Sequence, residues 1–240
     1  MVKLSKRLEH LSNMVKEGAI LADVGTDHGY IPIYLLQTKK IRHAFAMDIR
    51  KGPLLRAKEH IEAFGLGDYI TLRLSDGVQS LEKGEADSIL IAGMGGGVML
   101  HILEEGEAVI RLADELILQP QSEICRVREY LCKKGYVIDR EDIVFEEGKY
   151  YPMMHVAVWE KEKAAYSEKE WQIIYRYGEK LLKDKNEVLY QYLHHIKHQY
   201  ETILAGLIQQ NGEAARLRRA EIEKELSYAE SALEYQKEDL

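Results

Sequence analysis

The chain has 240 residues, of which 46% are hydrophobic, and its formal net charge is −7. This size accommodates one complete α/β domain and a smaller appendage. No segment approaches the roughly 18 consecutive apolar residues of a membrane span, and no apolar run follows the basic start, so we expect a cytoplasmic protein without a membrane partner.

The first 160 residues alternate short β-rich runs with helical stretches. Because such alternation is typical of a parallel sheet with helices on both faces, it predicts a doubly wound α/β fold. The expected strands cover residues 20–24, 43–48, 70–74, 88–92 and 116–119. The expected helices cover residues 30–39, 53–64 and 98–104, and a further helix begins at the cap candidate Ser122 and ends at Gly135.

After Gly135 the alternation stops. Residues 136–141 and 153–159 have the composition of two strands, with no helix between them. A parallel crossover needs about a dozen or more residues and usually a helix, so this spacing favours an antiparallel pair at the end of the sheet.

The remaining residues predict a second domain, which is helical and resembles a coiled coil. Ser167 and Glu170 form a capping box, and apolar residues follow at helical spacing over 171–181. Hydrophobic side chains from Leu189 to Leu207 then alternate steps of four and three, and the same stepping resumes beyond Gly212.

Two antiparallel helices are the simplest arrangement for this seam, which makes the protein a monomer. A homodimer through the tail is the alternative. We therefore expect domains at residues 1–160 and 161–240.

Four motifs follow strands of the predicted sheet. Residues 23–29, Asp-Val-Gly-Thr-Asp-His-Gly, join the first strand to the first helix, and Asp48 ends the second strand. Asp76 and Gly77 follow the third strand, and residues 92–97, Ala-Gly-Met-Gly-Gly-Gly, follow the fourth. Carboxyl ends of parallel strands are where such sheets bind ligands, so the four motifs together predict a nucleoside-containing cofactor.

The acids in these motifs distinguish between two cofactors. A nicotinamide enzyme would also use an acid after its second strand, but Asp27 stands where the second glycine of its phosphate-binding turn belongs. A carboxylate there repels a pyrophosphate, whereas S-adenosyl-L-methionine carries an ammonium and a sulfonium that Asp23 and Asp27 attract. The motifs favour a methyltransferase over a dehydrogenase.

With these residues assembled, the chain resembles the bacterial tRNA (adenine-22-N1)-methyltransferase family. The resemblance rests on residues 4–8, 22–29 with Pro32, 52–53, 73–77, 91–96 and 118–120. It implies a Rossmann-like methyltransferase fold, transfer of a methyl group to N1 of an adenosine in the D-loop region of tRNA, and a coiled-coil tail that helps to hold the tRNA.

Adenine N1 has an in-plane lone pair, so positioning is the main catalytic requirement. We expect Asp27 to stabilise the developing charge on the base, with the backbone of Gly93 and Met94 holding it; alternatively, Asp27 caps the following helix. No metal is expected, because no cluster with ligand spacing accompanies His28. The candidate cofactor-binding residues are Arg7, Asp23, Gly25, Asp27, His28, Asp48, Ile49, Asp76 and Gly77.

Two of these candidates have structural alternatives. In these, His28 forms a hydrogen bond within its own loop, and Arg7, on an N-terminal helix, forms a surface ion pair. Basic residues predict the contacts with tRNA phosphates, although a solvated surface explains them equally well. Those expected around the mouth of the sheet are Lys39, Lys40, Arg42, Arg50, Lys51 and Arg56, and those in the tail are Arg216, Arg218 and Arg219.

Two rival functions remain open at this point. The motifs alone also fit a methyltransferase that acts on another RNA, a protein or a small molecule. A non-catalytic coiled-coil scaffold is the rival from a different class, but it has no need of acids at three cofactor positions, Asp23, Asp48 and Asp76.

Overall fold

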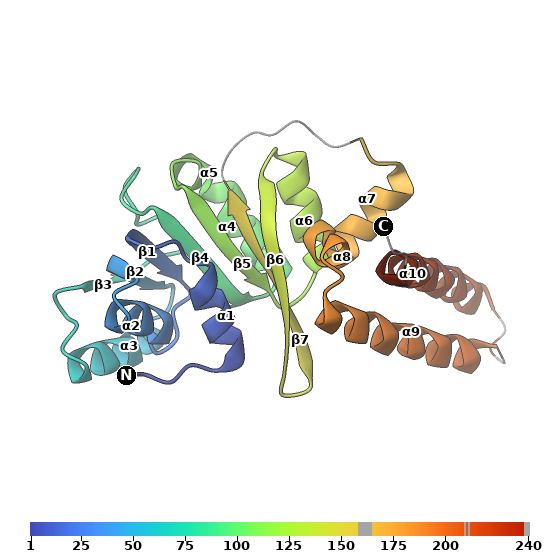
Figure 1. The fold of residues 1–240 in the computed structure, drawn as a ribbon, viewed down its shortest axis with the longest axis horizontal. Helices are drawn as coiled ribbons and strands as arrows, with labels where there is room; N and C mark the ends of the chain where they lie inside the picture. The colour runs from blue at the N-terminus through green and yellow to red at the C-terminus, as the bar shows by residue number, and fades with distance from the viewer. Residues whose placement is uncertain (158–164, 209, 211, 238–240) are drawn as a thin grey trace. The chain divides into compact units, whose positions relative to one another are not determined.

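The computed structural model describes residues 1–157, 165–208, 210 and 212–237. The chain forms two compact units, Met1–Lys163 and Ala164–Leu240. Figure 1 shows that the first unit is built from a sheet and its helices, and that the second is built from helices.

Among the described residues, the first unit has a seven-stranded sheet with the order β3-β2-β1-β4-β5-β7-β6. The strands β1 to β5 run parallel to their neighbours in this group, whereas β7 is antiparallel to both β5 and β6. The predicted parallel sheet with an antiparallel terminal pair is confirmed. The strands are β1 (Ala19–Val24), β2 (Ile41–Asp48), β3 (Ile70–Leu74), β4 (Ser88–Met94), β5 (Glu115–Pro120), β6 (Val137–Glu146) and β7 (Lys149–Ala157).

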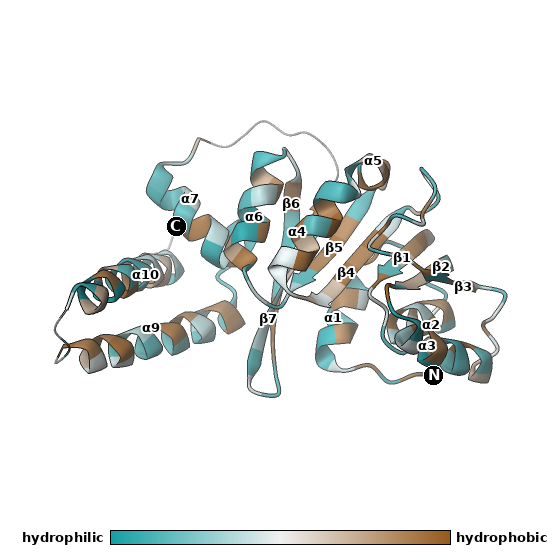
Figure 2. Cartoon of the chain, turned by 180° about the vertical axis from the view of Figure 1, so that it is seen from behind, coloured by the Kyte–Doolittle hydropathy of each residue, from teal (hydrophilic) through white to brown (hydrophobic). Residues whose placement is uncertain are grey.

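Helices cover both faces of this sheet. Buried side chains of α1, α2 and α3 pack with one set of strand residues, and those of α4, α5 and α6 pack with the other. Because both faces are buried, the central strands are continuously apolar, as the brown colour of β4 and β5 in Figure 2 shows. The helices are α1 (Lys6–Met14), α2 (Tyr30–Gln37), α3 (Lys51–Ala63), α4 (Gly96–Glu105), α5 (Glu107–Ile110) and α6 (Ile124–Lys133).

The last two strands are longer than predicted, and a tight turn joins them. Glu147 and Gly148 both have positive φ, 49° and 78°, which is the backbone of a type I′ hairpin turn. The sequence did not indicate this turn because Glu-Gly is not among the dipeptides that favour it. Residues 158 and 159 of the predicted last strand lie outside the described residues.

The predicted cap of α6 is wrong. The helix begins at Ile124 after Glu123, which has a φ of 51° and no capping side chain. The hydroxyl of Ser122 instead accepts a hydrogen bond from the backbone N–H of Gly96 at 3.2 Å, so it connects the loop after β5 to the start of α4. The predicted end of the helix at Gly135 is confirmed, with a φ of 83°.

The second unit begins with the predicted capping box, in which Ser167 and Glu170 bond to each other's backbone N–H. The apolar spacing over 171–181 predicts one helix, but the structure has two, because Gly178 adopts φ 88° and ψ 127° between them. The helices of this unit are α7 (Glu168–Tyr177), α8 (Glu179–Lys183), α9 (Glu187–Leu207) and α10 (Glu213–Lys237).

The helices α9 and α10 form the expected antiparallel pair. Lys197 forms an ion pair with Glu230 at 2.8 Å, and Arg219 donates a hydrogen bond to the carbonyl of Leu207, also at 2.8 Å. The predicted seam is buried at Leu189, but Ile203 is 39% exposed. A coiled coil along the whole of α9 is therefore not confirmed.

Candidate active site

The turn between β1 and α2 brings the backbone to the carboxyl edge of the sheet. The N–H groups of Gly25 and Thr26 both donate to the carbonyl of Met47 at 2.8 Å, which fixes the turn against β2. Gly25 has a φ of 79°, and a Cβ there would overlap the side chain of Met94. The positive φ favours a glycine, and the absence of a side chain lets Met94 lie directly against the turn.

Two buried carboxylates end the neighbouring strands β1 and β2. Asp23 is 7% exposed and Asp48 is 8% exposed. The pKa of Asp23 is raised to about 6, chiefly by burial; a hydrogen bond to Thr26 lowers it, and the nearby charge of Asp48 raises it. Asp48 Oδ1 accepts a hydrogen bond from the backbone N–H of Arg50 at 2.7 Å. A cationic or hydroxyl-bearing ligand would relieve this concentration of negative charge.

Asp27 lies on the exposed side of the same turn. Its Oδ1 accepts a hydrogen bond from Nη2 of Arg56 at 2.9 Å and lies 3.5 Å from Nε2 of His28. The N-cap of α2 is Gly29, with no side-chain cap, so Asp27 does not cap this helix. The structure removes that alternative and leaves the carboxylate at the mouth of the turn.

The His28 side chain packs within a group of three rings. Its ring stacks on those of Tyr30 and His60, with centroids 5.2 and 5.1 Å away. The Nδ1 atom of His28 is buried, and no residue in the described part of the chain bonds to it. A buried polar atom without a partner is a candidate ligand contact.

The loop after β4 meets the first helix. Gly93 has a φ of 76°, and beside it Nη1 of Arg7 donates a hydrogen bond to Gln119 Oε1 at 2.9 Å. The guanidinium of Arg7 also lies over the ring of Tyr151, 5.4 Å from its centroid. Arg7 is thus held inside the unit by a buried amide and an aromatic ring, and it does not form the surface ion pair considered as the alternative.

These elements enclose a cavity of about 490 Å³ at the carboxyl edge. Most of the predicted site residues line it: Arg7, Asp23, Gly25, Asp27, His28, Asp48, Gly93 and Met94. It is also lined by residues that were not predicted as site residues, namely Leu8, Thr26, Tyr30, Ile31, Pro53, Ala92 and Gln121. Thr26 stood inside a recognised motif, whereas Gln121 follows a strand without any distinctive pattern, so no signal indicated it.

Three predicted cofactor residues do not line this cavity. Ile49 is 59% exposed, and Asp76 is exposed at the end of β3, one strand beyond Asp48. Gly77 has a φ of 52°, and a Cβ there would press against Ile102, so its glycine is explained by packing. The cavity covers the ends of β1, β2 and β4 and stops short of β3.

The predicted basic residues separate into two groups. Lys39, Lys40 and Arg42 lie at the start of β2, at the edge of the sheet opposite the cavity, so their expected place around the mouth is wrong. Lys40 donates to carbonyls at the end of α1, and Arg42 pairs with Asp87 at 3.2 Å. They were misplaced because a basic run just before a strand starts lies a full strand length from that strand's carboxyl end.

The other basic residues keep positions compatible with a phosphate. Arg50 lines the cavity, and Lys51 and Arg56 follow it in α3. In the second unit, Arg218 pairs with Glu221 at 2.7 Å, and Arg216 is exposed on the same helix.

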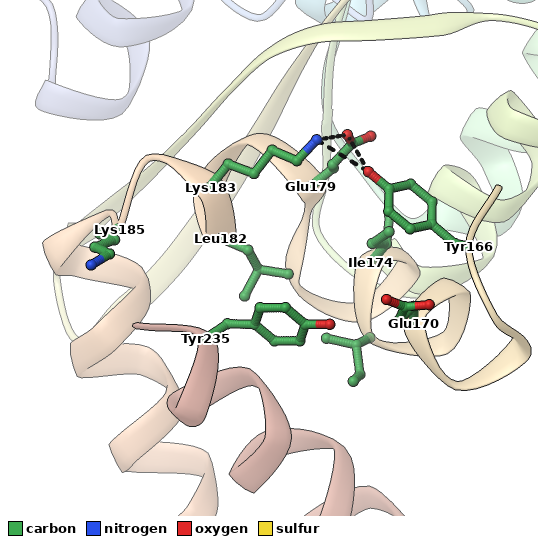
Figure 3. Close-up of a pocket in the computed structure, with 9 residues that line it drawn as sticks. Tyr166, Glu170, Ile174, Glu179, Leu182, Lys183, Lys185 and Tyr235 are labelled. Atoms are coloured by element: carbon green, nitrogen blue, oxygen red, sulfur yellow. Dashed lines mark hydrogen bonds and ion pairs between the residues drawn. The ribbon is translucent and has the colours of Figure 1, made fainter. Parts of the chain in front are cut away.

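A second cavity, of about 220 Å³, lies within the helical unit. Figure 3 shows Leu182 beside the ring of Tyr235, and the Lys183 ammonium pointing to Glu179 and Tyr166. Those polar groups bond to each other, at 2.5 Å for Lys183 to Glu179 and 2.8 Å for Tyr166 to Glu179. Since its charges are already paired and its lining is mostly apolar, this cavity lacks groups for methyl transfer.

No helix in the described ranges is both long and apolar enough to cross a membrane. Within the same ranges, no group of three or more His, Cys, Asp or Glu side chains is arranged to hold a metal ion.

Comparisons with known proteins place the chain among methyltransferases. A family model described as a methyltransferase domain matches residues 4–154. The curated tRNA (adenine(22)-N(1))-methyltransferase of Bacillus subtilis (strain 168) is 39% identical over 206 residues, which are 84% of this chain and 86% of that protein.

Two solved structures match the fold of this chain over nearly its whole length. The crystal structure of the B. subtilis M1A22 tRNA methyltransferase TrmK has a TM-score of 0.86 and 32% identity, and the match covers 97% of this chain and all of that one (100%). Streptococcus pneumoniae Sp1610, in complex with S-adenosyl-L-methionine, has a TM-score of 0.84 and 31% identity, over 96% of this chain and 100% of that chain.

Proposed function

This chain belongs to the tRNA (adenine(22)-N(1))-methyltransferase family, and we propose that it transfers a methyl group from S-adenosyl-L-methionine to N1 of adenosine 22 in tRNA. The observation that carries the proposal is the set of three carboxylates, Asp23, Asp27 and Asp48, in one cavity. They favour a cofactor with positive charge and ribose hydroxyls, and they disfavour the pyrophosphate of a dinucleotide.

The residues present fit S-adenosyl-L-methionine, because the raised pKa of Asp23 calls for a cation and the buried carboxylate of Asp48 calls for hydroxyl donors. Asp48 would accept from the ribose hydroxyls, and Asp23 would face the ammonium group. His28 Nδ1 and Arg7 would hold the carboxylate of the methionine part. The adenine would extend beyond the cavity towards the end of β3, where Asp76 with Gly77 and Ile49 would border it. When bound, this cofactor supplies an electrophilic methyl group on a sulfonium.

The chain's own residues orient the base and stabilise its charge. The bare backbone of Gly93, with Met94, would hold the adenine against the end of β4. Adenine N1 gains a bond and the ring becomes cationic, so a carboxylate close to the ring lowers the barrier. Asp27 is the candidate, because it lies at the mouth of the cavity and its partners among the described residues are Arg56 and His28.

We propose a division of labour between two domains, 1–160 and 161–240, with tRNA bound by both. Arg50, Lys51 and Arg56 would contact phosphates near the target base, and Arg216, Arg218 and Arg219 would contact phosphates elsewhere. Weaker candidates are Lys39, Lys40 and Arg42, because they lie at the start of β2, at the edge of the sheet opposite the cavity. Because α9 finds its partner within the chain, we propose a monomer, acting in the cytoplasm where tRNA is modified.

The test is methylation of an unmodified tRNA transcript by the purified protein with isotope-labelled S-adenosyl-L-methionine. Mass-spectrometric mapping should find one methyl group on N1 of adenosine 22. Transcripts in which position 22 is guanosine should remain unlabelled. Labelling at another nucleotide, or of protein instead of tRNA, would contradict the proposal.

A further inference from the structure

A glutamine side chain lies where the target base has to enter. Gln121 directly follows β5, and its backbone N–H donates to the carbonyl of Met94 at 2.8 Å. Its Nε2 lies 3.8 Å from the place that a Cβ on Gly93 would occupy. The backbone of Gln121 is therefore fixed beside the end of β4, and its side-chain amide lies near Gly93 in the lining of the cavity.

The amide group of Gln121 is available to a ligand. Among the described residues it has no hydrogen-bond partner, unlike the side-chain amide of Gln119. In Gln119, which is fully buried, Oε1 accepts from Arg7 and Nε2 donates to the carbonyl of Pro120. Gln119 thus has a structural task, whereas Gln121 offers one free donor and one free acceptor to the cavity.

In the strand order, Gln121 lies near the strands where we expect the base to bind, and away from the strands that carry the acids for the cofactor. The acids Asp23 and Asp48 belong to β1 and β2, and β4 and β5 lie on the other side of β1. A cofactor whose ribose and ammonium group lie at the acids of β1 and β2, with its carboxylate at Arg7, leaves Gln121 after β5 for the second substrate. Gln121 is therefore placed to contact the nucleobase.

Methylation at N1 restricts how the base can be recognised. The N1 lone pair must face the methyl group, so N1 cannot also accept a hydrogen bond from the protein. The edge that remains carries the N6 amino group as donor and N7 as acceptor. A glutamine amide matches this pair with two parallel hydrogen bonds, the arrangement by which proteins read adenine in DNA.

We propose that Gln121 is the specificity-determining residue for adenine, an inference that rests on the proposed function. Its Oε1 accepts from the N6 amino group, and its Nε2 donates to N7. During transfer the N1 lone pair forms the new C–N bond while the C–S bond breaks, the sulfur keeps the electron pair, and the base becomes cationic. The amide oxygen stabilises this charge through N6.

The experiment replaces N7 of the base by a C–H group. A full-length tRNA is assembled with 7-deazaadenosine at position 22, which lacks the N7 acceptor, and kcat/KM is compared with that of the unsubstituted tRNA. We expect the wild-type protein to be at least about fivefold slower on the 7-deaza tRNA. Gln121→Ala should be slower on the unsubstituted tRNA and show no further loss on the 7-deaza tRNA.

Two further variants sharpen the comparison. Gln121→Glu retains an acceptor for N6 but has no donor for N7, so it should also be insensitive to the missing atom. Gln79→Ala, a change of an exposed residue after β3 and away from the cavity, should keep the wild-type sensitivity. Calorimetric binding of S-adenosyl-L-methionine shows that each variant is folded.

Equal rates of the wild-type protein on both tRNAs, or a Gln121→Ala variant that still loses activity on the 7-deaza tRNA, would overturn the assignment. These outcomes differ from failure of the proposed function, in which the wild-type protein would not methylate the unsubstituted tRNA either.

Discussion

Arg56 holds the carboxylate of Asp27 with a hydrogen bond of 2.9 Å, across 29 residues of sequence. The pair joins the turn after β1 to α3, and both side chains remain partly exposed at the mouth of the cavity. A partly exposed ion pair contributes little to stability, so its value lies in where it directs the carboxylate.

Replacement of this carboxylate tests its catalytic role. Asp27→Asn keeps an oxygen that accepts from Arg56 but loses the charge, so we expect single-turnover methyl transfer to slow by about 100-fold. Calorimetric affinity for S-adenosyl-L-methionine should fall much less than the rate, because Asp23 and Asp48 remain. A loss confined to cofactor affinity, with an unchanged rate in the bound complex, would make Asp27 a binding residue instead.

Asp48 is expected to act on the cofactor alone. Asp48→Ala removes a buried charged acceptor, so affinity for S-adenosyl-L-methionine should fall by about 1 to 3 kcal/mol in calorimetry. Asp68→Ala, a change of an exposed acid before β3, is the matched control and should bind normally. Unchanged affinity of the Asp48 variant would remove its cofactor role.

Asp23 should reduce stability in the absence of cofactor. Its pKa is raised from 3.8 to about 6, so the folded chain holds this proton more tightly than the unfolded chain, and stability falls as pH rises from about 4 to 6. Above pH 6 the charged group costs up to about 3 kcal/mol. Asp23→Asn should therefore be more stable than the wild type in urea at pH 8, equal to it near pH 4, and a weaker binder of S-adenosyl-L-methionine. A variant less stable at pH 8 would contradict this account.

A buried histidine in β7 also predicts a loss of stability with rising pH, over a higher pH range than Asp23. His155 lies between Glu115, at 2.8 Å, and Asp139, at 2.5 Å. Burial lowers its pKa, but the two carboxylates outweigh burial and raise the pKa above 6.5. The stabilisation is complete below pH 6.5 and is lost as pH rises through the folded value.

His155→Gln should remove this pH dependence, measured as the free energy of unfolding in urea between pH 6 and 9. His101→Gln, at an exposed position in α4, is the control and should retain it. If the two variants behave alike, the carboxylates do not hold a charged imidazole.

The tail is expected to serve tRNA binding and not the cofactor. A chain that ends at Lys163 should fold and bind S-adenosyl-L-methionine, because the four cofactor motifs all lie before residue 98. Its tRNA affinity should fall, and the slope of log affinity against log salt should become shallower, since each lost phosphate contact reduces it by about 0.7 to 0.9. Unfolding of the shortened chain would show instead that the tail stabilises the first unit.

Local patterns predicted much of the fold and of the cofactor site. The alternation of strands and helices, the glycine at position 25 and the acid at position 48 each produce their effect within a few residues, so they can be recognised without the structure. The antiparallel pair was predicted from spacing alone, but its turn at Glu147 was not, because that residue adopts positive φ without the usual composition.

Some residues were misplaced or missed by the sequence analysis because their positions depend on contacts between distant segments of the chain. The hydrogen bond between Arg56 and Asp27 and the placement of Gln121 near Gly93 are set by packing, and no spacing rule connects their positions. Ser122 shows the same limit: its residue type suits a helix cap, yet it bonds to Gly96 at the start of another helix.

The order in which the sheet is assembled has a consequence for folding during synthesis. The first helix, α1, packs on the last hairpin: His10 bonds to Asp142 at 2.5 Å, and the N–H of Arg7 lies 3.4 Å from Glu146. While the ribosome is still making the middle of the chain, α1 lacks the hairpin of β6 and β7 to which it bonds, and β5 has no β7 beside it. The mouth of the cavity, which includes Arg7, is therefore completed only after residue 157 has left the ribosome, and a nascent chain should acquire its cofactor site late and in a single step.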